Sequence, residues 1–344
     1  GMRMRLKATL FTILISMLSL QCSEKLLQVQ KEIVVQRAAK LKSYHGVITE
    51  RDSYNQDIKT EVWYRQSDFS FFAKVLSPRG FIGDSIMVHK GRTRIYFANA
   101  RFGLEFYGDN FVPEAGQVLN YLEKEFDWHV KHYNVSTGER SELAGIPVVE
   151  LQYQPKEEFV GKIFIGTWRT RVFENYSFPM SVELMNMPQV DKGYSFAFEK
   201  VEFNLDYDDE AFQFQFPRGT TIGYYNLGQA AISESAAKSR ANFRLQFPGF
   251  EKLNVKRQGI YPAQGLIPAF TTVYRNNAEF IYFNAVRDYQ LNLAKPRGLK
   301  IKGKFEYNVQ FAGFIKSIFW KDGATLYTVV SNLPLSDLIT IIQN

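Results

Sequence analysis

Between residues 44 and 216, apolar and aromatic side chains recur at every second position in one segment after another. The segments "FSFFAKVLSP", "YSFAFEKVEFN" and "AFQFQFPRGT" show this alternation clearly, and Gly, Asn, Asp and Pro separate the alternating runs. Because successive side chains of a strand point to opposite faces of a sheet, this period predicts strands with one apolar face. Most runs follow one another directly, which predicts antiparallel hairpins and argues against a Rossmann-type nucleotide site.

The composition agrees with a β-rich globular chain. Among 344 residues there are 30 Phe and 19 Tyr, which favour strands and large apolar surfaces. The chain is 45% hydrophobic and 22% charged, and it is long enough for two domains. The formal charge of +7 includes Arg3, Arg5 and Lys7, so the remainder carries +7 − 3 = +4. We therefore expect no nucleic-acid partner.

An uncharged, mostly apolar run from Ala8 to Leu20 follows these three basic residues. Its length, about 13 residues, falls short of the roughly 20 that a membrane-spanning helix needs but suits a secretory signal. We therefore expect residues 1–21 to be a signal peptide. The following "LSLQCS" resembles the lipobox of bacterial lipoproteins, although Gln21 replaces the usual small residue. Cys22 is the expected lipidation site and membrane anchor, and the alternative is a buried free thiol.

The location that this resemblance implies is the cell envelope, on the periplasmic side of the outer or the inner membrane. Ser23, directly after the expected anchor, resembles an outer-membrane sorting signal. An anchor of two or more acyl chains holds a protein stably at a membrane.

The periodicity also predicts helices and a second unit. Apolar residues spaced by three and four predict an amphipathic helix from Ser23 to Leu41 and a short helix near Pro113 to Phe126. We expect a first domain over residues 22–220, a linker over 221–242 with a short helix, and a smaller α+β domain over 243–344. A helix in "LSDLITIIQ", capped by Ser336, would end the chain.

The apolar faces of these strands would together form a hollow if the sheet is curved and the faces point the same way. Burial of apolar area is worth about 25 cal/mol per Å², so something should cover the hollow. A helix laid across it, an apolar ligand, or side chains filling a core would each do so. The residues expected to line it are Phe69, Phe71, Val75, Ile95, Phe97, Phe196, Phe198, Phe212 and Phe214.

The order of the segments resembles a known superfamily. A helix, a long meander, "FFAKVLSP", "IMVHKGRTRIYFAN", "GERSELAGIPVVELQYQP" and a closing stretch that ends in "FQFQFPRG" are similar to the LolA, LolB and RseB lipoprotein-carrier fold over residues 24–220. This resemblance implies an α+β fold: a curved antiparallel open half-barrel covered by helices. The later "FWKDGATLYTVVSNLPLSDLITII" resembles a small α+β module that follows carrier-like domains in envelope proteins.

The resemblance further implies a non-enzymatic protein whose cavity binds acyl chains or a lipidated peptide, with a lipid or lipidated protein as partner. One alternative is an RseB-like sensor or assembly protein that binds another envelope protein. Another is a structural lipoprotein with a filled core.

No motif in the sequence predicts catalysis. "GDSI" places Ser85 as in a lipase-like nucleophile block, but its surroundings are a meander and no histidine follows His132. In "WHVKH", the predicted strand would send His129 and His132 to opposite faces. The acidic run over residues 206–210 lacks a glycine for a calcium loop and is interpreted as a solvated hairpin tip. We expect no metal and no cofactor.

The strongest charge feature is "AKPRGLKIKGK". Its alternation places Lys300, Lys302 and Lys304 on one face of a strand. One interpretation is an edge strand protected by lysines. The other is a contact with anionic lipid headgroups or an acidic partner, worth about 1 kcal/mol per cation.

Overall fold

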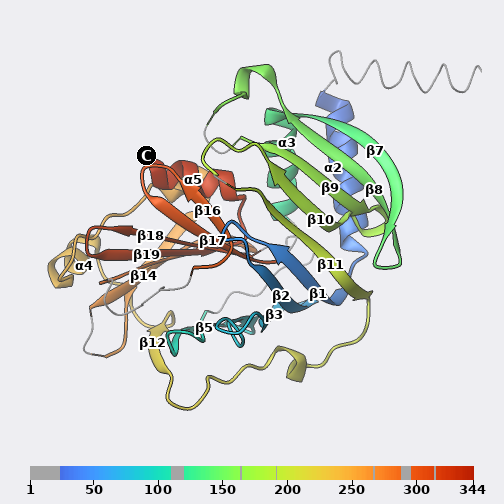
Figure 1. Ribbon diagram of the computed structural model, residues 1–344. Helices are drawn as coiled ribbons and strands as arrows, with labels where there is room; N and C mark the ends of the chain where they lie inside the picture. The colour runs from blue at the N-terminus through green and yellow to red at the C-terminus, as the bar shows by residue number, and fades with distance from the viewer. Residues whose placement is uncertain are drawn as a thin grey trace, which may run out of the picture.

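The computed structural model describes residues 24–109, 120–162, 165–190, 192–265, 268–287, 296–313 and 315–344. The predicted signal peptide and Cys22 lie outside these residues. Figure 1 shows two large curved sheets, neither closed into a barrel, with helices α2 and α3 beside one half of the first sheet. Among the described helices none is long and apolar enough to span a bilayer.

The first sheet has twelve strands in the order β12-β6-β5-β4-β3-β2-β1-β11-β10-β9-β8-β7. Neighbours pair antiparallel, except that β12 pairs parallel with β6. The predicted antiparallel meander is therefore confirmed. The strands are β1 (Ser43–Arg51), β2 (Asp57–Arg65), β3 (Ser70–Ser77), β4 (Ser85–His89), β5 (Arg92–Phe97), β6 (Phe102–Tyr107), β7 (Tyr133–Leu143), β8 (Ile146–Pro155), β9 (Thr167–Phe173), β10 (Phe178–Met185), β11 (Tyr194–Phe203) and β12 (Thr221–Asn226).

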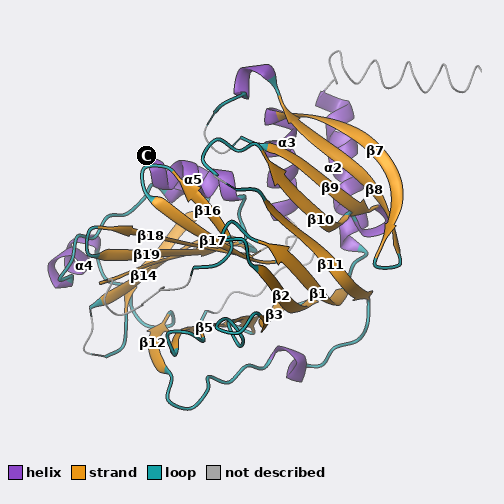
Figure 2. Ribbon diagram, in the orientation of Figure 1, coloured by secondary structure: helices purple, strands orange, loops and turns teal. Residues whose placement is uncertain are grey.

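Helices α2 (Glu24–Ala39) and α3 (Asn120–His132) lie across the β7–β10 half of this sheet (Figure 2). The predicted first helix is confirmed, although Val29 and Ile33 of its apolar positions are exposed. The predicted end of the second helix is wrong, because α3 continues through the residues expected to begin a strand.

The second sheet has seven strands in the order β13-β14-β15-β19-β18-β17-β16. Two helices, α4 (Glu234–Arg240) and α5 (Leu335–Gln343), accompany it. The predicted C-terminal helix is confirmed, but the predicted Ser336 cap is wrong: Pro334 is the N-cap residue, and Ser336 lies inside the first turn. The strands are β13 (Lys256–Pro262), β14 (Ala269–Asn276), β15 (Glu279–Arg287), β16 (Leu299–Lys302), β17 (Glu306–Ala312), β18 (Ile315–Asp322) and β19 (Thr325–Ser331).

The segment "AFQFQFPRGT", predicted as a strand, is not one. A short 3-10 helix, η3 (Asp209–Phe212), precedes a stretch without regular structure that runs to residue 220. The next strand, β12, begins at Thr221, inside the stretch expected to be a linker. The alternating phenylalanines correctly indicated that one side of this segment is buried. An extended segment that forms no hydrogen bonds to a neighbouring strand produces the same pattern as a strand.

Candidate functional site

One face of the first sheet is apolar because alternate residues of its strands point to the same side. On β5, for example, Ile95 and Phe97 share this face, and on β3 Phe71 and Ala73 do. We call it the inner face. Its buried members in the main core include Tyr44, Ile48, Val62, Tyr64, Phe71, Ala73, Ile86, Ile95, Phe97, Leu104, Phe106 and Phe198.

The second sheet covers the β1–β6 half of the inner face. Phe97 meets Phe319 with ring centroids 5.7 Å apart, and Phe106 stacks on Tyr282 at 5.0 Å. Val273, Ile315 and Val330 belong to the same apolar core. The sequence left three possible covers for this face: a helix, an apolar ligand or a core filled by side chains. Over the β1–β6 half, side chains fill the core, and they come from the second sheet rather than from a helix.

A small cavity remains between the two sheets. Its volume is about 30 Å³, which is room for about one water molecule. Val75, Ile95 and Phe97, three of the residues expected to line a hollow, line this small cavity from the first sheet. Arg297 and Gln310 line it from the second unit. The closed arrangement therefore holds no space for an acyl chain at this position.

Other predicted lining residues fall into two groups. Phe69, Phe71 and Phe198 are buried in the main core, and Phe196 is half-buried between the two main clusters. The predicted common face is wrong for Phe212 and Phe214, which lie on the outer face. There Phe212 packs with Phe72 and Met87, and Phe214 lies 6.0 Å from the ring of Phe72. The physical reason is that these residues follow η3 across the outside of the sheet instead of pairing with it.

A polar network attaches the start of β16 to the first sheet. Arg297 Nε donates to Asp84 Oδ2 at 3.0 Å, and both side chains are nearly buried. The backbone nitrogen of Gly298 donates to Asp52 Oδ2 at 3.0 Å, and the backbone nitrogen of Ser53 donates to the carbonyl of Gly298 at 3.0 Å. We call Asp52, Ser53, Asp84, Arg297 and Gly298 the junction. It places charged groups at the border of an apolar interface.

Glu50 lies beside the junction with its carboxyl group buried. The hydroxyl of Tyr194 donates to Glu50 Oε2, and no described residue bonds Oε1. Burial raises the pKa of Glu50 to about 7, against the opposing effects of the Tyr194 hydrogen bond and the charge of Arg297. Glu50 therefore titrates near neutral pH inside the protein.

Helix α3 makes a second attachment to the other sheet. Lys124 pairs with Glu279, and Lys316 lies 3.3 Å from Glu125. Glu279 and Lys316 are both buried. Burial raises the pKa of Glu279, although the neighbouring Lys124 opposes this. Asp109, which follows β6, also pairs with Arg275 of β14. The second sheet is thus held by paired charges at these three places around an apolar centre.

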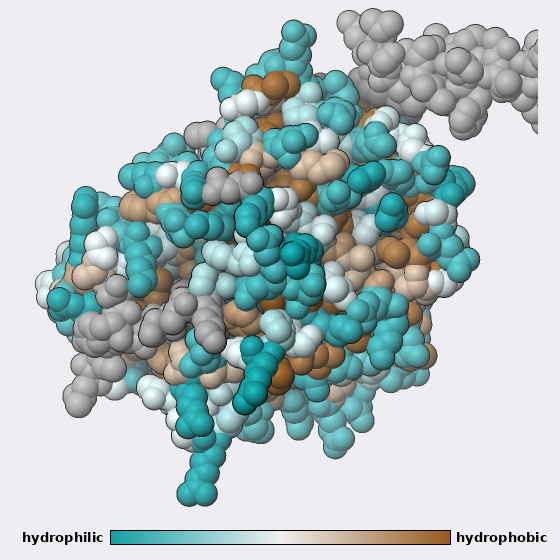
Figure 3. Space-filling view, in the orientation of Figure 1, coloured by the Kyte–Doolittle hydropathy of each residue, from teal (hydrophilic) through white to brown (hydrophobic). Residues whose placement is uncertain are grey.

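The β8–β11 part of the inner face is less fully covered. Leu151, Thr170, Val182 and Phe196 face one another in a row across these four strands, and all four are half-buried. Figure 3 shows apolar residues between hydrophilic ones over this half of the molecule. Phe196 is the one predicted lining residue that belongs to this row.

His129 and His132 lie on α3, so the predicted strand placement is wrong. Each ring nitrogen Nδ1 bonds the backbone carbonyl four residues earlier, at 2.7 Å and 2.8 Å. His129 also packs on Tyr153 of β8 at 5.0 Å. Burial lowers the pKa of His129, which favours a neutral ring. These contacts describe packing of the helix against the sheet.

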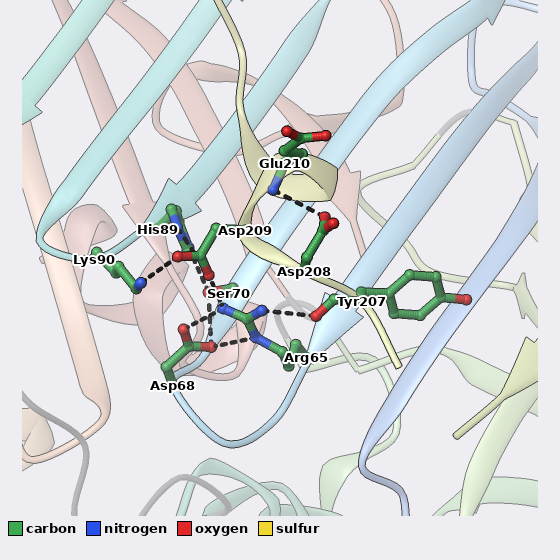
Figure 4. Close-up of polar contacts among 9 residues, drawn as sticks. All are labelled: Arg65, Asp68, Ser70, His89, Lys90, Tyr207, Asp208, Asp209 and Glu210. Atoms are coloured by element: carbon green, nitrogen blue, oxygen red, sulfur yellow. Dashed lines mark hydrogen bonds and ion pairs between the residues drawn. The ribbon is translucent and has the colours of Figure 1, made fainter. Parts of the chain in front are cut away.

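Asp206, Asp208 and Glu210 of the acidic run are exposed, as predicted, but the run precedes the short helix η3 and is not a hairpin tip. Within it, Asp209 lies among cations (Figure 4). Arg65 lies 2.8 Å from Asp209 and 2.6 Å from Asp68, and Lys90 pairs with Asp209 as well. Hydrogen bonds from Lys90 and Arg65 lower the pKa of Asp209 to about 2. Asp68, His89 and Asp209 could in principle hold a metal ion. Arg65 and Lys90 already neutralise their carboxylates.

Ser70 is a hydroxyl that the sequence analysis missed. Its Oγ donates to Asp68 at 2.7 Å and lies 2.7 Å from His89 Nδ1, but the residue is fully buried. No local motif joins these residues, because 19 positions separate Ser70 from His89. Ser85, the hydroxyl that the sequence analysis considered and rejected as a nucleophile, donates to the carbonyl of Gly83 at 2.8 Å.

The lysines of the basic stretch lie at an edge. β16 is the last strand of the second sheet, as the protected-edge interpretation expects. Lys300 lies 3.4 Å from Glu306, and the backbone nitrogen of Lys302 donates to the carbonyl of Gln189 at 2.8 Å. Lys304 follows the strand and lies over the ring of Phe305. Contact with an anionic surface stays a prediction.

No protein-family model matches the sequence, and no curated protein matches it. Solved structures that match include MucB, at 12% identity and a TM-score of 0.45 over 91% of this chain and 96% of that chain. The complex of MucA and MucB from Pseudomonas aeruginosa matches with the same identity and coverage at a TM-score of 0.41.

Lipoprotein LppX of Mycobacterium tuberculosis matches at 10% identity and a TM-score of 0.35, over 54% of this chain and 99% of that chain. A LolA superfamily protein of Nitrosomonas europaea matches at 8% identity and a TM-score of 0.24, over 53% and 96%. The matches thus include the superfamily that the sequence resembles. They concern the course of the backbone, so function rests on this chain's own residues.

Proposed function

We propose that this protein is a non-enzymatic binding protein of the bacterial envelope, whose inner face receives acyl chains or a lipidated peptide. The observation that carries the proposal is the apolar inner face of an unclosed sheet, covered by a second sheet through an apolar centre with charged attachments at its border. The proposal requires this cover to move away from the inner face, which exposes part of an apolar core that the two sheets share.

Ligand binding in this proposal replaces one apolar cover by another. The closed form leaves a cavity of about 30 Å³, so a chain enters only when the second sheet moves away from the inner face. Burial of each CH₂ group is worth about 0.8 kcal/mol, so a sixteen-carbon chain supplies about 12 kcal/mol. That gain offsets part of the apolar burial that is lost when the two sheets part.

Acylation of Cys22 would hold the protein at the membrane that supplies such chains. The mild charge of +4 after the signal is in keeping with a lipid or lipidated protein as partner rather than a nucleic acid.

Uptake of a fluorescent fatty acid by delipidated protein tests the proposal. We expect stoichiometric uptake, and faster uptake by Arg297→Ala, because this variant removes the charged pair with Asp84. Arg218→Ala is the matched control, since Arg218 is exposed. Folded protein that takes up no fatty acid, with either variant, contradicts the proposal.

The alternative is a sensor or assembly protein that binds another envelope protein. The filled inner face favours it, because the closed form offers outer surfaces and no lipid-sized space between the sheets. A stable complex recovered with the tagged protein, together with absent fatty-acid uptake, would support this alternative.

A further inference from the structure

Basic residues are concentrated in one segment of the second unit, residues 234–257, which contains α4 and the start of β13. This segment has six Lys or Arg and two Glu, so its formal charge is +6 − 2 = +4. The chain after the predicted signal peptide carries +4 in all, so the charges of its other segments cancel. The excess positive charge of the protein therefore lies in this one region.

Phe247 joins the parts of this region. Its ring centroid lies 5.8 Å from Lys238 Nζ and 5.2 Å from the guanidinium carbon of Arg257. Arg257 in turn lies 3.3 Å from Glu234 and 3.4 Å from Glu251. Helix α4, the extended segment after it and the start of β13 therefore meet at one place.

Three cations of the region are left over from these pairs. Both glutamates are paired with Lys238 or Arg257. Among the residues that the structure describes, no carboxylate pairs with Arg240, Arg244 or Lys252, and all three are exposed. Each lies within three positions of a residue that takes part in the contacts around Phe247, and therefore within about 10 Å of it. We call Arg240, Arg244 and Lys252 the basic patch.

The backbone that carries the basic patch is fixed to the second sheet, although it forms no strand. The carbonyl of Arg244 accepts hydrogen bonds from Thr325 Oγ1 and from the hydroxyl of Tyr327, both at 2.9 Å. Arg287 Nη1 donates to the carbonyl of Asn242 at 3.2 Å. Because the chain is held in this way, the charges are in place before a partner arrives, which lowers the cost of ordering on binding.

The basic patch lies far from the expected membrane anchor. Helix α2 begins at Glu24, two positions after Cys22, so an acylated Cys22 would hold the start of α2 within about 7 Å of the bilayer. Figure 1 shows α4 at the opposite side of the molecule from α2. The patch therefore faces away from the bilayer that would carry the anchor. An acidic segment of a protein, rather than the headgroups of that bilayer, is the complementary surface within its reach.

We propose that the basic patch is a docking site for an acidic segment of another envelope protein. Exposed guanidinium and ammonium groups form charge-assisted hydrogen bonds with carboxylates, and complementary charge also accelerates association. The inference goes beyond the proposed function, because it requires no opening between the two sheets and no acyl chain. The expected anchor enters only in the choice of a protein over a bilayer.

A triple variant of the basic patch, Arg240→Gln with Arg244→Gln and Lys252→Gln, tests this docking site. The probes are a fluorescein-labelled peptide of eight consecutive glutamates and vesicles of phosphatidylcholine and phosphatidylglycerol. Each protein is the full chain with Cys22→Ser, so that no acyl anchor binds the vesicles. Peptide binding is followed by fluorescence anisotropy at low and at moderate salt, and vesicle binding by co-sedimentation.

The matched control removes three exposed cations outside the region, with Arg79→Gln, Lys162→Gln and Arg218→Gln. It changes the net charge by the same amount, so it separates the patch from the charge of the whole protein. Because all the altered side chains are exposed, both triple variants should resist urea as well as the parent chain does.

We expect the patch variant to bind the acidic peptide about tenfold more weakly at low salt, which corresponds to about 1.4 kcal/mol spread over three cations. The control should lose less than about twofold, and binding by the parent chain should fall as salt is added. Equal losses in the two triple variants, or a parent chain that does not bind the peptide at low salt, overturn the inference. Vesicle binding that depends on the patch, without peptide binding, overturns it in favour of a lipid surface. Each of these results leaves fatty-acid uptake, and with it the proposed function, standing.

Discussion

Replacement of Glu50 by glutamine should change how the stability of this protein depends on pH. Glu50 is 6% exposed, and its pKa is raised from 4.5 to about 7, chiefly by burial. Between these two values the folded protein holds a proton that the unfolded chain has released. Unfolding in this range therefore releases a proton, so a rising pH favours the unfolded state.

The size of the effect follows from the rise in pKa. A rise of about 2.5 corresponds to about 3 kcal/mol, since one pKa unit is worth about 1.4 kcal/mol. The stability contributed by protonated Glu50 is fully present below pH 4.5 and is lost as the pH rises through about 7. Glu50→Gln has no proton to release and keeps the hydrogen bond from Tyr194, so it should escape this loss.

Urea denaturation of both proteins at pH 4.5, 6 and 8, followed by circular dichroism, measures the effect. The advantage of Glu50→Gln over the unaltered protein should grow by about 3 kcal/mol from pH 4.5 to pH 8. Glu158→Gln is the control, because Glu158 is an exposed glutamate. Parallel pH profiles for Glu50→Gln and the unaltered protein would refute the account of Glu50 as a buried, mostly desolvated carboxyl.

Three further changes test other parts of the structure. Gly298→Ala should lower the free energy of unfolding by more than about 2 kcal/mol in urea titrations, because φ is +95° and the new Cβ would lie 2.1 Å from the carbonyl oxygen of Val309. The control is Gly323→Ala, which has a positive φ of +60° but open space around the new Cβ, and it should lose only about 1 kcal/mol. Phe212→Ala should cost about 3 kcal/mol in the same titrations yet leave fatty-acid uptake unchanged, and reduced uptake by a folded variant would contradict its place on the outer face. Cys22→Ser should move the protein from the membrane fraction to the soluble fraction, with the loss of acyl mass in mass spectrometry; retention in the membrane would contradict the lipidation prediction.

The repeating elements were predictable, because a period of two reports directly which side of a strand is buried. Phe71 and Ala73 illustrate this, and both lie on the inner face as expected. The prediction of strands from local sequence was wrong where two kinds of structure share one pattern. "WHVKH" suits the end of a helix as well as a strand. Phe212 and Phe214 alternate as in a strand, but their segment pairs with no strand.

The attachments between the two sheets had no signal in the sequence. Arg297 and Asp84 are 213 positions apart, and neither stands in a recognisable motif. The same holds for Lys316 and Glu125, which are 191 positions apart. Such pairs become visible only when the fold brings distant segments together, so the sequence predicted the apolar hollow but not the sheet that fills it.

The arrangement of the two sheets also bears on how the chain matures. Strand β1 pairs with β11, about 150 positions later, and the second sheet, which covers the β1–β6 half of the inner face, begins at Lys256. Because synthesis proceeds from the N-terminus, the aromatic side of the first sheet emerges well before the second sheet. Contacts between distant segments form slowly, and uncovered apolar strands aggregate. A holding chaperone would thus matter more for this chain than for one whose core closes locally.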